Sequence, residues 1–215
     1  MSKYRGKKHH REAHPKIFVW SHTERAEIEY FQEFKDHLQT ARLMPKKYVT
    51  WRPQELIEYV IKWKKENIVQ KDGDQVWCIF DVDSFFSDPK DKIELLDCIK
   101  LAHQNGVKIA YVNECFEVWI LLHFEKITSS IKRGKAMEEK IKNKFKSLKL
   151  GDFKKNQKVF KPLLHLQSKA ISNAKSLVPD YEKINWEVQL GKKGNPSTSI
   201  HFLVEEIHKL AIPNN

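Results

Sequence analysis

The chain has 215 residues, a formal net charge of +11 and a pI near 9.4. Its content of 40% hydrophobic and 11% aromatic residues is enough for a packed core, which excludes a wholly disordered protein. The excess of positive charge predicts an anionic partner, most often nucleic acid, although a solvated lysine-rich surface would give the same composition.

The cysteines and the apolar runs bear on the cellular compartment. Cys78, Cys98 and Cys115 each lie in an apolar run and none belongs to a Cys-x-x-Cys pair, which argues against a disulfide framework or a structural zinc site. No apolar run has the length of a membrane span, and residues 1–14 lack the apolar segment of a secretory signal. We therefore expect a cytoplasmic protein with buried free thiols and no membrane contact.

Strands and helices alternate along the first part of the chain. The spacing of apolar residues predicts strands at 17–20, 48–51, 76–84 and 107–112, and helices at 24–39, 53–63 and 91–104. Asp88 and Pro89 suit the start of the third helix, as its N-cap and its first-turn proline. This order is typical of right-handed βαβ units, so it predicts an α/β fold with a mostly parallel sheet flanked by helices.

Two acids end the buried strand that begins at Val76. Asp81 and Asp83 are separated by one residue, so their carboxylates point the same way from the strand's C-terminal end. Ligands of open α/β sheets bind beyond that end. Two neighbouring carboxylates repel each other unless a cation lies between them, and Mg²⁺ or Mn²⁺ is the cation that such oxygen ligands favour. The pair therefore predicts a divalent metal site.

A third acid lies in an almost wholly apolar stretch. Residues 115–124 predict a buried helix in which Glu117 is the one acid. Glu117 is either a helix-entry residue that binds backbone amides or a further carboxylate of the metal site. His123, in the same stretch, is better explained as a packing residue than as a metal ligand.

The later part of the chain is basic. Residues 126–161 contain thirteen Lys and Arg against three acids, and helices are predicted within this span and at 163–177 and 200–210. Such a surface can follow a phosphate backbone or can simply be solvated. The residues predicted to bind nucleic acid are Lys132, Arg133, Lys135, Lys142, Lys154, Lys155, Lys192 and Lys193. We divide the chain into a basic arm (1–15), an α/β core (16–125) and a basic helical region that packs on the core (126–215).

Three segments together resemble one protein family. Residues 80–83 read FDVD, residues 113–119 read NECFEVW and are followed by His123-Phe124, and residues 195–198 read NPST. In order and spacing they resemble the RloB-like proteins of prokaryotes, which are similar to Toprim-domain proteins. The resemblance implies a Toprim-like core, a divalent metal (Mg²⁺ or Mn²⁺), cleavage of DNA or RNA, a role in antiviral defence and an AAA- or ABC-type ATPase partner.

The family pattern also has a glutamate just after the first strand, and this chain departs from it there. Ser21 or His22 occupies that place, so Glu24 or Glu27 would have to supply the carboxylate. On the nuclease interpretation, Asp81 and Asp83 hold the metal, one of these glutamates moves the proton, and Glu117 assists.

Other interpretations stay open at the level of the sequence. The first is a catalytically impaired Toprim-like module that binds nucleic acid or a partner. The second is a phosphatase of the haloacid dehalogenase type, because a buried strand ending in Asp-x-Asp also fits a phosphoaspartyl nucleophile. A third interpretation is a glycosyltransferase, in which an Asp-x-Asp pair also binds metal. This chain has no sugar-nucleotide signature to accompany the pair. The sequence leaves assembly into a homo-oligomer open.

Overall fold

The computed structural model describes residues 15–22, 26–67, 73–82, 88–154 and 158–211. In this part of the chain, a five-stranded sheet has the strand order β2-β1-β3-β4-β5. The strands are β1 (Ile17–Ser21), β2 (Leu43–Lys47), β3 (Gln75–Asp81), β4 (Val107–Asn113) and β5 (Ser197–Thr198). β1 to β4 run parallel and β5 is antiparallel to β4. The predicted α/β fold with a mostly parallel sheet is confirmed.

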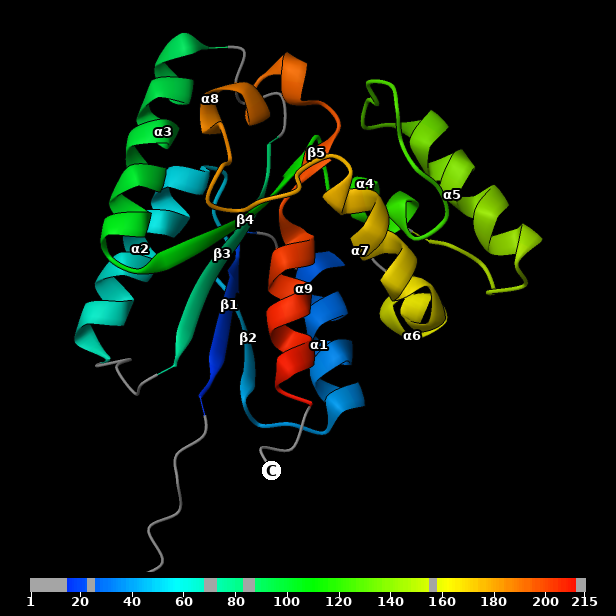
Figure 1. Ribbon diagram of the computed structural model, residues 1–215, viewed down its shortest axis with the longest axis horizontal. Coiled ribbons are helices and arrows are strands. Elements are labelled where there is room, and N and C mark those ends of the chain that lie inside the picture. Colours follow the sequence, from blue (N-terminus) through cyan, green and yellow to red (C-terminus); the bar gives the residue numbers. More distant parts are fainter. Residues whose placement is uncertain (1–14, 23–25, 68–72, 83–87, 155–157, 212–215) are drawn as a thin grey trace, which may run out of the picture.

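Helices cover both faces of the sheet (Figure 1). Their bounds are α1 (Ala26–Leu38), α2 (Pro53–Glu66), α3 (Pro89–Gln104), α4 (Glu117–Leu122), α5 (Lys135–Ser147), α6 (Phe160–Leu163), α7 (Gln167–Lys175), α8 (Trp186–Gln189) and α9 (Ile200–Lys209). α2 and α3 pack on one face, and α1 and α9 pack on the other. α5, α6 and α7 lie beyond α1 and α9, on the same side of the sheet.

The two faces of β3 belong to different cores. Val76, Cys78 and Phe80 pack with α2 and α3, whereas Trp77 and Ile79 pack with α1, α4 and α9. Side chains alternate along a strand, so the next odd-numbered residue, Asp81, points to the α1 face. The periodicity of β3 therefore decides on which side of the sheet its terminal acid lies.

The second strand lies at 43–47, not at the predicted 48–51. Its middle residue, Pro45, lacks a backbone N–H and cannot donate to a neighbouring strand. β2 is an edge strand paired on one side only, to β1, and an edge tolerates proline because one row of its backbone groups has no sheet partner. The backbone N–H of Tyr48 still donates to Ser21 O at 3.0 Å, so the chain follows β1 a little beyond β2.

The C-terminal part of the chain contributes to the sheet layer. Thr198 Oγ1 and the backbone N–H of Ser199 both donate to Tyr111 O, at 2.8 and 3.0 Å, which holds β5 against β4. α9 then packs its buried residues on the α1 face. The division of the chain at residue 125 stays a prediction, while β5 and α9, from beyond it, complete the sheet and its cover.

Within the described residues, no helix combines the length and the apolar character that spanning a bilayer would require.

Candidate active site

The carboxyl ends of β1, β3 and β4 meet at one edge of the sheet. The chain leaves β1 for the α1 face and leaves β3 for the opposite face, so the direction of winding reverses between these two neighbours. In a sheet of order 2-1-3-4-5, this reversal opens the crevice where ligands bind. The residues that follow β1 and end β3 are therefore the first to consider for chemistry.

Asp81 is the last residue of β3 and is buried at this edge, with its side chain 6% exposed. The guanidinium of Arg133 donates from Nη2 to Asp81 Oδ2. The Arg133 side chain is 36% exposed, so the pair joins a buried carboxylate to a cation at the rim of the site. Asp83, the second predicted metal ligand, lies outside the described residues, and its role stays a prediction.

Glu27 lies on the buried side of α1, which is unusual for a glutamate. Together with Tyr30, Phe31 and Phe34 it forms a stripe with helical spacing, and Glu27 itself is 2% exposed. α1 begins just after β1 and packs on the face to which Asp81 points, so its first turn lies at the carboxyl edge of β1, the strand beside β3. Of the two glutamates that the sequence proposed, Glu27 is thus buried at this edge, and Glu24 lies outside the described residues.

Glu117 begins α4, which follows β4, and is 8% exposed. The pKa of the buried Cys115 thiol shows which charged groups lie near Glu117. Burial raises the pKa of Cys115, and the negative charges of Glu117 and Asp81 raise it further, while Arg133 opposes them. These four side chains therefore share one electrostatic environment. The sequence indicated the two acids but gave no sign that Cys115 and Arg133 would lie beside them.

Two asparagines hold the loops around the site. Asn113, at the end of β4, donates from Nδ2 to the backbone oxygens of Gln189 and Gly191, at 2.8 and 2.9 Å. Asn195 donates to Ile131 O at 2.8 Å and accepts from Ile131 N at 3.1 Å. The first contact ties residues 189–191 to the sheet, and the second ties the segment around Asn195 to the loop that carries Arg133.

The turn at 192–194, which follows the residues held by Asn113, brings two lysines to the same edge. Lys192 and Lys193 are exposed on a 3₁₀ turn that ends at Gly194. A Cβ on Gly194 would lie 2.5 Å from backbone atoms of Gln189, so only glycine permits this close approach to α8. The turn is thereby fixed next to the end of β4.

The other predicted nucleic-acid-binding residues divide by position. Lys132 and Arg133 precede α5 and Lys135 is its first residue, so these three lie next to the turn held by Asn195. Lys142 lies further along α5 and pairs with Glu139 at 3.4 Å. Lys154 lies after α5, and Lys155 lies outside the described residues.

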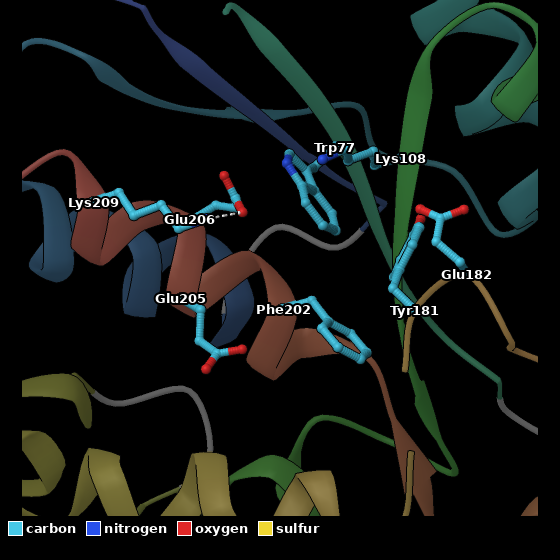
Figure 2. Close-up of a pocket in the computed structure, with 8 residues that line it drawn as sticks. All are labelled: Trp77, Lys108, Tyr181, Glu182, Phe202, Glu205, Glu206 and Lys209. Carbon is cyan, nitrogen blue, oxygen red and sulfur yellow. Dashed lines mark hydrogen bonds and ion pairs between the residues drawn. The ribbon is translucent and has the colours of Figure 1, made fainter. Parts of the chain in front are cut away.

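A pocket of about 350 Å³ lies at the opposite end of the sheet (Figure 2). It is lined by Trp77, Lys108, Tyr181, Glu182, Phe202, Glu205, Glu206 and Lys209. Glu206 pairs with Lys209 at 2.6 Å, and Lys108 lies 5.1 Å from the centre of the Trp77 ring. Glu205 of this pocket pairs with Lys175 outside its lining at 2.6 Å, and none of the predicted acids lines it.

A comparison with models of known protein families finds a match to this chain. The model of the RloB-like protein family matches residues 17–207, from the first residue of β1 into α9. The chain belongs to the RloB-like family. No curated protein and no solved structure matches it.

The oxygen ligands at the edge of this RloB-like chain suit a hard divalent cation. The pair between Asp81 and Arg133 shows that the position beside the Asp81 carboxylate already accommodates positive charge. Among the described residues, no three Asp, Glu, His or Cys side chains stand together in a metal-binding arrangement. Asp83 and Glu24 fall outside that set, so Asp81 fits as a ligand and the rest of the ligand set stays a prediction.

Proposed function

We propose that this RloB-like protein is a metal-dependent nuclease that cleaves phosphodiester bonds of DNA or RNA. The observation that carries the proposal is the placement of two buried acids at the edge where the winding of the sheet reverses: Asp81 ends β3, and Glu27 lies in the first turn of α1, which follows the neighbouring strand β1. Exposed basic residues border that edge, as a polyanionic substrate requires. The Toprim-like character of the core is part of this proposal and rests on the family resemblance.

Each acid has a distinct part in the proposed reaction. Asp81, with Asp83, would hold Mg²⁺ or Mn²⁺, which when bound polarises the phosphodiester and offsets charge on the leaving oxygen. Glu27 transfers the proton between water and the reacting oxygens, because it is a carboxylate excluded from bulk solvent at the same edge. Glu117 assists from the start of α4 by keeping the local field negative enough to retain a cation.

The substrate is held from the side of β4. Lys132, Lys135, Lys192 and Lys193 lie on the two segments that Asn195 joins, so they form one basic border rather than scattered charges. We further propose that the protein acts in the cytoplasm, in antiviral defence and together with an ATPase partner. The family resemblance supports the last two roles, and the three buried free cysteines suit a reducing compartment.

The test is cleavage of labelled DNA and RNA by the purified protein in Mg²⁺ or Mn²⁺. Asp81→Asn should abolish cleavage, as should a chelator, whereas Asp97→Asn, a matched change at an exposed position on α3, should not. The nuclease assignment fails if no nucleic acid is cleaved, alone or with an ATPase partner, or if Asp81→Asn cleaves as fast as the wild type.

A second candidate is a nucleic-acid-binding module without catalysis. It is favoured by the engagement of Asp81 with Arg133 and by the lack of a three-ligand metal group among the described residues. This function predicts binding that persists in Asp81→Asn, needs no divalent metal and weakens steeply with salt. A phosphatase is less favoured, because the acid-bearing strand is the third along the chain rather than the first.

A further inference from the structure

The contact between Arg133 and Asp81 joins a partly exposed loop residue to a buried strand residue. Asp81 ends a central strand that is paired on both sides, and its side chain is 6% exposed. Arg133 lies in the loop before α5, and its side chain is 36% exposed. The carboxylate cannot turn to solvent without disturbing the sheet, whereas the guanidinium can.

The backbone around Arg133 is held by hydrogen bonds, and its side chain extends from there to the partly exposed rim of the site. Ile131 is held by Asn195 on both its N–H and its C=O, and the Arg133 N–H donates to Glu114 Oε2 at 2.7 Å. Gly134, which follows, has φ +145° and no atom within 4 Å of the place where a Cβ would be. A redirected guanidinium would therefore reach the rim by rotation of the partly exposed side chain, with the held backbone left in place.

A metal ion on Asp81 would compete with the guanidinium for the same carboxylate. Two cations at one carboxylate repel each other, so binding of the metal displaces Arg133. The displaced guanidinium stays at the rim beside Lys132, where its planar set of donors matches the oxygens of a phosphodiester.

We propose that Arg133 exchanges partners: it neutralises Asp81 when no metal is bound, and it binds a substrate phosphate oxygen once the metal takes Asp81. This inference rests on the proposed nuclease function and adds an order of events to it. The pair keeps the site from holding metal tightly until a polyanion is present to receive the arginine. Metal and substrate then bind cooperatively, because each removes the obstacle to the other.

The test measures metal affinity directly, without substrate, by titration calorimetry with Mn²⁺ at 0.15 M salt. Apparent affinity falls with the fraction of molecules in which the competing pair is open, so Arg133→Gln should bind Mn²⁺ about tenfold more tightly than the wild type. Lys132→Gln is the matched control: it removes one positive charge from the adjacent exposed position and should change the affinity less than about twofold. Arg133→Lys, which keeps the charge, should give an intermediate value.

The outcomes separate the inference from the function on which it rests. Adding Arg133→Gln to Asp81→Asn should not restore binding, and a non-cleavable oligonucleotide should tighten Mn²⁺ binding in the wild type but not in Arg133→Gln. Equal affinities of Arg133→Gln, Lys132→Gln and the wild type would overturn the exchange while leaving a nuclease intact. Absence of Mn²⁺ binding in every variant would overturn both.

Discussion

The two partners of the Arg133–Asp81 pair should contribute unequally to the stability of the metal-free protein. Arg133→Gln leaves a buried carboxylate at the end of β3, near Glu117, without its guanidinium. Asp81→Asn removes the buried charge itself, and the arginine, already one-third exposed, can turn to water. We therefore expect the arginine substitution to be the more destabilising one, although it lies at the more exposed position.

The expected size follows from the burial of each side chain. Removing one partner of a fully buried pair costs about 3–5 kcal/mol, and the partial exposure of Arg133 lowers this to about 2 kcal/mol. For a chain of this length, that is a fall in Tm of roughly 4–8 °C. Asp81→Asn should change the free energy of unfolding by less than about 1 kcal/mol, since asparagine can still accept from the guanidinium.

Urea unfolding in a chelator at pH 7, followed by fluorescence and circular dichroism, gives the comparison. The double variant should be about as stable as Asp81→Asn alone, and added Mg²⁺ should restore stability to Arg133→Gln but not to the double variant. A larger loss for Asp81→Asn than for Arg133→Gln would refute the reasoning, because it would mean that the guanidinium is not the main group that stabilises the carboxylate.

Three further outcomes are expected. Glu27→Gln should slow cleavage by about 10²–10⁴-fold and Glu24→Gln by less than about threefold, and the reverse order in single-turnover rates would move the proton-transfer role to Glu24. Burial lowers the pKa of His123 to about 4 from an ordinary value of 6.5. The unfolded chain therefore takes up a proton first as the pH falls from 6.5 to 4, and stability declines by up to about 1.4 kcal/mol per pH unit. His123→Gln should decline less steeply between pH 7 and pH 5 in urea unfolding. Replacing Lys192 and Lys193 by Gln should reduce the slope of log affinity against log salt by about 1–2, measured by fluorescence anisotropy, and an unchanged slope would remove them from the interface.

Local signals predicted the elements of the fold well. Asp88 and Pro89 begin α3 as expected, with the Asp88 side chain accepting from Lys90 N at 2.8 Å. The run from Val76 to Asp81 forms a central strand, since a strand buried on both faces needs a continuous apolar sequence. The strand at 43–47 was missed because it contains Pro45. Proline is compatible with an edge strand but not with a central one, and the sequence does not say which strand is at the edge.

The candidate site was only partly predictable for the same reason. A signal for Glu27 was present, because it shares the helical spacing of Tyr30, Phe31 and Phe34, and this spacing distinguishes it from an exposed acid. The partner of Asp81 had no such signal. Arg133 lies 52 residues away in a loop, and the hydrogen bonds that aim it come from Glu114 and from the segment around Asn195. Contacts set by three distant segments cannot be found from the periodicity of any one of them.

This arrangement makes the basic region part of the site rather than an appended binding surface. The guanidinium beside Asp81 comes from the loop before α5, the exposed lysines lie on a turn held by Asn113, and β5 covers the outer edge of β4. Because Asp81 is buried at an edge closed by these later segments, a chain cut after residue 125 would lose the cation that offsets its charge as well as the cover of its strand. Loss of activity in such a fragment could therefore not be assigned to a loss of substrate binding. Point substitutions at Arg133 and at the lysines separate the two effects.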